Sequence, residues 1–281
     1  MAAASVPGDE ANAAPSTVSA PVAGAGPPQS VAERVPVTVV IAARNEGVNI
    51  AACIDSVRWA DEILVADHGS EDDTTEQAAR AGATVITGQP GDTIGALRNS
   101  AIAQARYHWI LVVDADERGT PELGRAVHDV TARPASAAYR IPRKNFFFGG
   151  EIRHGGWQSD RPVRLFDSAL RYDESRVHEH VMTSGEPATL RASLLHYPYP
   201  TLDVYFEKFV RYSVWWAEDH YGRGKRVSVL DIIVRPPARF VSMFILRGGI
   251  LDGVRGAVLA SLASASVCAK YVRLWAMQCE F

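Results

Sequence analysis

Apolar residues in the first half of the chain form short runs separated by stretches of helical periodicity. Four runs rich in Val, Ile, Leu and Ala are typical of strands buried on both faces, and they lie at residues 37–42, 62–67, 83–87 and 109–113. Between them, apolar spacing predicts helices at 47–59 and 93–105. A further helix is predicted to begin at a capping box formed by Ser70 and Asp73 and to end at about residue 81. Pro121 suits the first position of a further helix. These units predict an α/β fold with a mainly parallel sheet and helices on both faces.

The pattern changes twice along the rest of the chain. After about residue 136, shorter apolar runs separated by Gly and Pro predict strands that complete the sheet. From residue 202 the spacing becomes helical, with a predicted break at Pro236 and Pro237 and a last helix at 250–278. The longest charge-free run in this region, 256–269, has 14 residues, whereas a membrane span needs about 20. We therefore expect amphipathic helices that lie at a membrane surface without crossing it.

Composition divides the chain into three regions. Residues 1–34 are mostly Ala, Pro, Gly, Ser and Val without periodicity, which predicts a disordered tail. Residues 35–200 are expected to form the α/β domain, and 201–281 a helical region that associates with a membrane. With 281 residues, of which 47% are apolar, the chain is long enough to bury a substantial core.

Charge and cysteine content narrow the partners and the compartment. A net charge of −3 argues against nucleic acid. From Thr201 onward, 11 Lys and Arg stand against 7 Asp and Glu, which predicts contact with an anionic surface. The three cysteines form no CxxC pair, and no basic segment followed by an apolar core precedes the first strand. Both features predict a cytoplasmic protein in a reducing compartment.

Polar side chains follow three of the predicted strands at the points where the strands end. The clusters are Arg44–Asn45–Glu46, Asp67–His68, and Asp114 with Asp116 and Glu117. Since the carboxyl ends of parallel strands meet at one edge of a sheet, these clusters should converge, and ligands of such sheets bind there. We therefore expect the functional site at this edge.

Asp114 and Asp116 stand two positions apart after a buried strand, so their side chains would share a side if the strand continued. Carboxylates this close raise one another's pKa unless a cation lies among them. Mg²⁺ and Mn²⁺ favour a few carboxylates together with phosphate oxygens, so the predicted cation is a metal that carries a diphosphate. A solvated loop that caps the next helix is the alternative.

A second alternative is a phosphatase of the haloacid dehalogenase type, in which an apolar strand also ends in DxD. Two features count against it. Those enzymes need Thr or Val where this chain has Arg118, and their motif usually follows the first strand of the domain.

Several segments together resemble family 2 glycosyltransferases with a GT-A fold. They are VVIAARNEGVNIAACIDSV, WADEILVADHGSEDDT, GALRNSAIAQA and WILVVDADER. The later segments RIPRKNFFFGGEIRHGGWQSDRPVRLF, VHEHV, LLHYPYP and YGRGKR narrow the resemblance to bacterial lipopolysaccharide inner-core β-glucosyltransferases that act on heptose. The similarity covers about residues 36–275 in order. It is more specific than a single DxD motif.

The resemblance implies a uridine diphosphate sugar as donor, inversion at the anomeric carbon and a divalent metal, Mg²⁺ or Mn²⁺. It also implies roles for residues at the sheet edge. Arg44, Asn45 and Glu46 would border the nucleotide, and Asp67 would accept a hydrogen bond from the base. Arg98 and Asn99 would line the diphosphate–sugar pocket. Asp114 would face the ribose and the sugar, and Asp116 would hold the metal. His68 departs from the family pattern, which has a small residue beside the base, and this puts the specificity for uridine in doubt.

An inverting transfer also needs a base near the acceptor hydroxyl. The candidates are Glu179 in VHEHV and Asp160 in WQSDRPVRLF. His178 and His180, on either side of Glu179, would share a face of a strand. With no third ligand nearby, they are better explained as partly buried histidines than as a zinc site. Arg161 and Arg164 are expected to contact acceptor phosphates or to pair with Asp160 and Asp167.

We therefore expect a cytoplasmic, membrane-peripheral, inverting glycosyltransferase. It would move a sugar, glucose by resemblance, from uridine diphosphate to a lipopolysaccharide-core or related glycolipid acceptor. Basic residues of the C-terminal region would hold it on an anionic leaflet. These are Arg223, Lys225, Arg226, Arg235, Arg239 and Arg247. The alternatives are sugar transfer to a polyprenyl phosphate, the phosphatase described above, and an inactive module that binds a sugar nucleotide.

Overall fold

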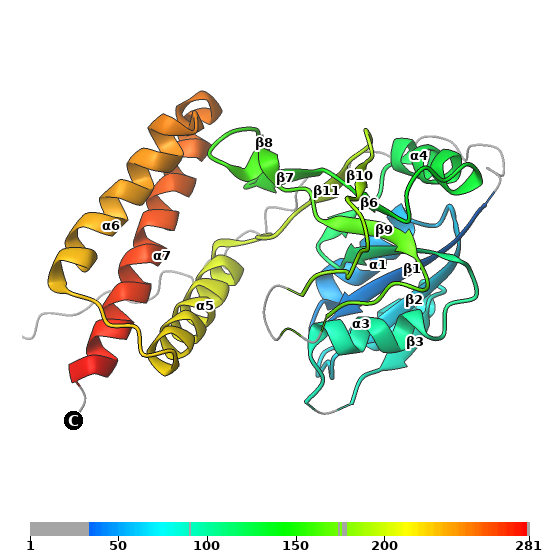
Figure 1. Ribbon diagram of the computed structural model, residues 1–281, viewed down its shortest axis with the longest axis horizontal. Coiled ribbons are helices and arrows are strands. Elements are labelled where there is room, and N and C mark those ends of the chain that lie inside the picture. Colours follow the sequence, from blue (N-terminus) through cyan, green and yellow to red (C-terminus); the bar gives the residue numbers. More distant parts are fainter. Residues whose placement is uncertain (1–33, 90, 174, 176–178, 280–281) are drawn as a thin grey trace, which may run out of the picture. The chain divides into compact units, whose positions relative to one another are not determined.

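The computed structural model describes residues 34–89, 91–173, 175 and 179–279. Its central sheet has seven strands in the order β10-β6-β9-β4-β1-β2-β3 (Figure 1). β1 (Val35–Ala43) pairs in parallel with β2 (Ala60–Asp67) and β4 (Trp109–Asp114), and β2 pairs in parallel with β3 (Thr84–Thr87). β9 (Val163–Asp167) runs antiparallel between β4 and β6 (Ala138–Arg140), and β10 (Ala188–Thr189) closes the edge. The predicted mixed, mainly parallel sheet is confirmed.

Helices cover both faces of this sheet, as predicted. Alternate residues of β1 enter different hydrophobic clusters: Val39 and Ile41 belong to one, and Val40 belongs to the other. The first cluster includes buried residues of α1 (Gly47–Ser56), α2 (Thr74–Arg80) and α4 (Pro121–Ala132), and the second includes those of α3 (Ile94–Ile102). The alternation follows from the two-residue repeat of a strand.

Sequence features predicted the first residues of two helices, and the structure confirms one of these predictions. Pro121 does open α4, and Thr120 caps it by accepting a hydrogen bond from the Leu123 amide. The capping box expected at Ser70 and Asp73 is wrong, because α2 begins only at Thr74 and has no side-chain cap. Ser70 is used elsewhere: its hydroxyl donates to Asp67 and accepts from the Asn45 amide.

A second, four-stranded sheet was not predicted. Its order is β5-β11-β7-β8, built from β5 (Glu117–Arg118), β11 (Leu194–His196), β7 (Arg143–Phe147) and β8 (Gly150–Ile152). The expectation that the segment after residue 136 completes the main sheet therefore holds only for β6, β9 and β10. Because β5 follows directly after β4, the small sheet brings β7 and β11 to the edge where the polar clusters lie.

The C-terminal region consists of α5 (Leu202–Gly222), α6 (Val229–Val241), the π-helical turn η2 (Ser242–Leu246), the 3-10 turn η3 (Gly249–Asp252) and α7 (Gly253–Cys279). The predicted break at Pro236 and Pro237 is wrong, because α6 continues through both. An interior proline costs a helix about 3 kcal/mol. Here Pro236 is buried and its carbonyl accepts a hydrogen bond from Ser264 of α7, so packing between the two helices opposes that cost.

The C-terminal helices pack on the small sheet through one hydrophobic cluster. Phe147 and Ile152 of the sheet meet Tyr205 of α5, Met243 of η2 and Leu259 of α7. Polar contacts support this packing, since the backbone amides of Arg153 and His154 both donate hydrogen bonds to the carboxylate of Asp252.

One helical segment in the described part of the chain, Gly249–Cys279, is long and apolar enough to cross a membrane. It spans 31 residues, of which the selected 18-residue window is only 17% buried. The charge-free run 256–269 is thus only part of a longer apolar helix. Length and composition are weak evidence of crossing, so the predicted surface location stays a prediction. Of the predicted disordered tail 1–34, only Arg34 lies within the described residues.

Candidate active site

The three polar clusters meet at the carboxyl edge of the central sheet, as predicted. In the register of the parallel strands, Ala43 of β1 lies opposite Asp67 of β2, and Ala42 lies opposite Asp114 of β4. The loops that follow these three strands therefore start side by side.

The loop after β2 is organised around Asp67. Its buried carboxylate accepts hydrogen bonds from the amides of Gly69 and Ser70, each at 3.0 Å, and from the Ser70 hydroxyl. Asn45, at a positive φ of 54°, joins this loop to β1, because its amide donates to Ser70 and its side chain accepts from the Glu71 amide. The bonds show how Asp67 and Asn45 shape the edge. Their predicted contacts with a base and a nucleotide stay predictions.

Two other residues of the predicted nucleotide border differ in environment. Arg44 is exposed. Glu46 is partly buried and accepts a hydrogen bond from Asn49 at 2.8 Å, and burial raises its pKa above the usual value despite that bond. His68, the departure from the family pattern, bonds through Nε2 to the carbonyl of Asp92 at 2.9 Å. The imidazole thus ties the loop after β2 to the segment that precedes α3.

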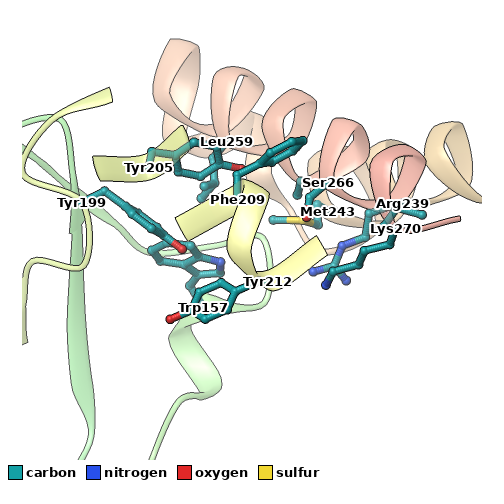
Figure 2. A pocket seen from close by; sticks show the side chains of 12 residues that line it. Trp157, Tyr199, Tyr205, Phe209, Tyr212, Arg239, Met243, Leu259, Ser266 and Lys270 are labelled. Atoms are coloured by element: carbon teal, nitrogen blue, oxygen red, sulfur yellow. The ribbon is translucent and has the colours of Figure 1, made fainter. Parts of the chain in front are cut away.

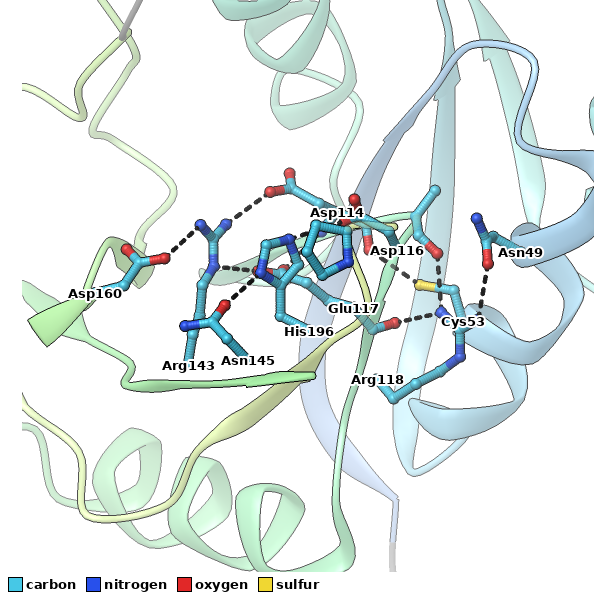
Figure 3. Close-up of polar contacts among 12 residues, drawn as sticks. Asn49, Cys53, Asp114, Asp116, Glu117, Arg118, Arg143, Asn145, Asp160 and His196 are labelled. Carbon is cyan, nitrogen blue, oxygen red and sulfur yellow. Dashed lines mark hydrogen bonds and ion pairs between the residues drawn. The ribbon is translucent and has the colours of Figure 1, made fainter. Parts of the chain in front are cut away.

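Three arginines surround Asp114 (Figure 3 shows the Arg143 side of this cluster). Arg98 Nη2 lies 2.7 Å from Oδ1, Arg143 Nη2 lies 2.8 Å from Oδ2, and Arg164 also contacts Oδ2. Burial raises the pKa of Asp114, but the charges of these arginines outweigh it and hold the pKa well below its usual range.

Glu117 shares two of the same arginines. Its side chain is fully buried, and its carboxylate contacts Arg143 Nε at 2.5 Å and Arg164 Nη2 at 3.3 Å. It also accepts a hydrogen bond from the Asp114 amide at 2.8 Å. The cations beside Asp114 and Glu117 are therefore guanidinium groups, whereas the sequence predicted a metal as the cation that neutralises Asp114 and Asp116.

The expected partners of Arg161 and Arg164 are also corrected. Arg164 of β9 pairs with Asp114 and Glu117, because β9 runs beside β4 in the central sheet. Asp160 pairs instead with Arg143 at 3.1 Å, and Asp167 pairs with His108 at 2.9 Å. Arg161 is exposed.

Asp116 faces a different set of groups. Asp116 would share a side with Asp114 only if the strand continued, but β4 ends at Asp114 and a turn follows. His196 Nε2 lies 3.6 Å from Asp116 Oδ1, and Lys208 Nζ lies 3.8 Å from Oδ2. Burial raises the pKa of Asp116, but a charged His196 beside the carboxylate lowers that pKa by more.

The chemistry of this donor set fits a divalent metal bound jointly with a diphosphate. Asn145 Oδ1 lies 2.6 Å from His196 Nδ1, so in the neutral imidazole Nδ1 carries the proton and Nε2 presents a lone pair toward Asp116. One carboxylate and one imidazole leave most coordination positions to phosphate oxygens. Within the described residues no three His, Cys, Asp or Glu side chains converge as a complete metal site, so the donor would have to supply the remaining ligands.

The two candidate bases both join the arginine cluster. Glu179 has a side chain 17% exposed and pairs with Arg98, which also contacts Asp114. Asp160 is 40% exposed and pairs with Arg143, which also contacts Asp114. The structure thus brings both candidates to the predicted edge.

Asn99 positions the segment that leads to Glu179. Its side chain donates to the carbonyl of Tyr172 at 3.0 Å and accepts from the amide of the same residue at 2.9 Å. Its predicted place in the donor pocket stays a prediction. Glu179 does not lie in a strand as expected, and His180 is exposed. His178 lies outside the described residues, so the histidine pair cannot be described.

Sequence reasoning missed Arg143, His196 and Lys208 as site residues. All three come from elements far along the chain: Arg143 from β7, His196 from β11 and Lys208 from α5. His196 and Arg143 fall in segments that carry the family resemblance, but neither has a spacing that marks it locally.

Three comparisons place this chain among known proteins. The family model for glycosyl transferase family 2 matches residues 38–194. The lipopolysaccharide core biosynthesis glycosyltransferase LpsC of Rhizobium meliloti is 27% identical over 252 residues, which is 83% of this chain and 92% of LpsC. An uncharacterized glycosyltransferase of Rickettsia typhi is 25% identical over 236 residues, which is 79% of this chain and 80% of that protein.

Among solved structures, mannosyl-3-phosphoglycerate synthase from Rubrobacter xylanophilus matches with 26% identity and a TM-score of 0.36. The match covers 40% of this chain and 41% of the synthase, so it spans less than half of either protein.

Proposed function

This chain belongs to glycosyl transferase family 2, and from that premise we propose that it transfers a sugar with inversion from a nucleotide-diphosphate donor to a glycolipid acceptor. The proposed donor is uridine diphosphate glucose, and the proposed acceptor is the lipopolysaccharide core or a related glycolipid. The similarity to LpsC, named for lipopolysaccharide core biosynthesis, supports this acceptor class over most of the chain.

The proposal for the donor site rests on one observation: Asp116 and His196 lie together at the sheet edge beside Asp114, which is bound by arginines. Asp116 and His196 would hold a divalent metal, which when bound supplies positive charge to the leaving diphosphate. Asp114, kept ionised by Arg98, Arg143 and Arg164, offers acceptor oxygens to hydroxyl groups of the donor. The remaining residues of the edge shape the loops that enclose the nucleotide.

Glu179 is the proposed base that takes the proton from the acceptor hydroxyl. Its carboxylate is joined to Asp114 through a single guanidinium, that of Arg98, so the base and the proposed sugar contact are held by one side chain. Asp160 is the alternative base, and it is joined to Asp114 through Arg143 in the same way. A positioned general base contributes about 10²–10⁴-fold to the rate.

Donor binding tests the proposal directly. With Mn²⁺ and uridine diphosphate glucose at about 100 times its Kd, the native state should gain about 2.7 kcal/mol. For a protein of this size that corresponds to a rise in Tm of about 5–11 °C. Asp116→Asn should keep the fold and lose the part of the rise that Mn²⁺ adds over EDTA. Glu122→Gln, an exposed carboxylate on α4, is the matched control and should behave like the unsubstituted protein.

The result against the proposal is equally specific. If no uridine, guanosine or adenosine diphosphate sugar raises Tm with Mg²⁺ or Mn²⁺, the donor assignment is wrong. If Asp116→Asn retains the full metal-dependent rise, the metal assignment is wrong.

We further propose that the enzyme works at the cytoplasmic face of an anionic membrane, held there by the turn between α6 and α7. Four aliphatic residues of this turn are strongly exposed: Ile245 (58%), Leu246 (77%), Ile250 (57%) and Leu251 (72%). Arg247 lies among them, so the turn combines apolar surface with positive charge, as interfacial segments do. A glycolipid acceptor would be met at such a surface.

A further inference from the structure

A cavity of about 360 Å³ lies between the C-terminal helices and the turn that contains Trp157. It is bounded by the 3-10 turn η1 (Trp157–Ser159), α5, α6, η2 and α7. Figure 2 shows two cationic side chains, Arg239 and Lys270, at one end and aromatic rings, including Trp157 and Tyr212, toward the other. The described site residues do not use this cavity.

The two cations of the cavity have no paired carboxylate among the described residues. Arg239 of α6 and Lys270 of α7 are both half-buried, and neither makes a hydrogen bond or ion pair with another side chain in the part of the chain that the structure describes. Burial lowers the pKa of both groups; the neighbouring charge of Arg247 lowers that of Arg239 further, and Arg239 does the same to Lys270. Partly desolvated like charges without an anion are costly, which points to a ligand that supplies one.

The aromatic end suits a saccharide. Tyr199, Tyr205 and Tyr212 line the cavity together with Trp157 and Phe209. Such rings offer a flat apolar face, and the three tyrosines add a hydroxyl group at the edge. The half-exposed Tyr212 ring is accessible to a ligand, with 44% of its surface open.

The aromatic end also adjoins the proposed metal site. Lys208 Nζ lies 5.6 Å from the centre of the Tyr199 ring and 3.8 Å from Asp116. On the other wall, Asn145 donates to the carbonyl of Trp157 at 3.0 Å and bonds to His196. Tyr199 and Trp157 of the cavity wall therefore contact the residues that surround the proposed metal site.

We propose that this cavity binds the acceptor through a phosphorylated saccharide, with the phosphate between Arg239 and Lys270 and a sugar ring against the aromatic wall. The proposal rests on the proposed function, since it names how the acceptor of that same site is recognised. Phosphate is the ligand chemistry that two adjacent cations favour, and guanidinium pairs with it through two parallel hydrogen bonds.

The test is a calorimetric titration of the full chain with glucose 6-phosphate, glucose, inorganic phosphate and dodecyl phosphate. Glucose 6-phosphate should bind more tightly than glucose or inorganic phosphate. Arg239→Gln and Lys270→Gln should each weaken it by about 10- to 100-fold, as expected for a lost charge-assisted hydrogen bond. Lys270→Arg should retain most of the affinity. Arg226→Gln, which removes an exposed cation outside the cavity, is the control and should change nothing.

Several results would overturn the inference. Equal affinity for glucose and glucose 6-phosphate would contradict the phosphate site. Unchanged affinity for glucose 6-phosphate in both Gln variants would contradict it too. Equal binding of inorganic phosphate and glucose 6-phosphate, unaffected by Tyr212→Leu, removes the saccharide. Tighter binding of dodecyl phosphate reassigns the cavity to a lipid headgroup. Binding of uridine diphosphate glucose, measured on the same variants, reports separately on the proposed function and should not change.

Discussion

Replacement of Arg164 by Met should be among the most damaging single changes in the catalytic region. The side chain is only 5% exposed, and it contacts both Asp114 and the fully buried Glu117. Met fills much of the same volume but leaves Asp114 with two guanidinium partners in place of three, and Glu117 with one in place of two. Removing one partner from a buried ion pair typically costs about 3–5 kcal/mol. At about 2–4 °C per kcal/mol for a chain of this size, Tm should fall by about 6–20 °C.

Thermal and urea unfolding followed by circular dichroism would measure this loss. Arg161→Met is the matched control: Arg161 is exposed, and its substitution should change stability by no more than about 0.5 kcal/mol. The pH dependence gives a second readout. Because the folded pKa of Asp114 lies below its ordinary value of 3.8, the stability that its pairing contributes is present above that pH and is lost as pH falls further. The difference between the two proteins should therefore shrink below about pH 4.

A loss below about 1 kcal/mol at pH 7 would refute this reasoning, because a solvated or redundant pair behaves that way. A difference that grows toward acid pH would refute it too, since the cluster would then not depend on ionised carboxylates.

Three further predictions concern the base, the cavity and the membrane. Glu179→Gln should bind donor normally and lose about 10²–10⁴ of the transfer rate in a radiolabel assay; if the double variant with Asp160→Asn transfers at full rate, the acceptor is an already ionised phosphate. Lys270→Met should raise the free energy of unfolding at pH 7 by a few tenths to about 1 kcal/mol. Because the pKa of Lys270 in the folded state lies below 10.5, this gain in stability should shrink as pH rises toward 10.5. An unchanged or lower denaturation midpoint would contradict this prediction. The protein should float with phosphatidylglycerol vesicles at low salt, less at high salt and poorly with phosphatidylcholine, and Leu246→Glu with Leu251→Glu should stop flotation. Sedimentation of the unsubstituted protein at low salt would contradict the membrane proposal.

The central sheet was predictable because its signal is local. Each strand of the first half is an apolar run, each helix has its own periodicity, and short parallel β–α units leave few ways to assemble them. The convergence of Asp67 and Asp114 follows from that topology alone. What periodicity could not provide was the small sheet, whose short strands pair residues as distant as Arg118 and Leu195.

The partners of the carboxylates were unpredictable for the same reason. Asp114 was correctly placed at the edge, but its neutralisation depends on Arg143 and Arg164, which reach it only through the pairing of β7 and β9 with distant strands. Clustered carboxylates indicate that a cation is needed, but the sequence alone does not distinguish a metal from a guanidinium group. Only the arrangement of the later strands decides between them.

The arginine cluster has a consequence for how substitutions in this site should be interpreted. Glu179 and Asp160, the two candidate bases, are each joined to Asp114 by one shared guanidinium, Arg98 in the first case and Arg143 in the second. Carboxylates that share a cation compete for it, so loss of one carboxylate strengthens the pairing of the cation with the other. Asp114→Asn should therefore reduce donor affinity and also tighten the pairing of Arg98 with Glu179. A loss of rate in that variant cannot be assigned to the donor contact alone, whereas Glu179→Gln leaves Asp114 with three arginines and isolates the proton transfer.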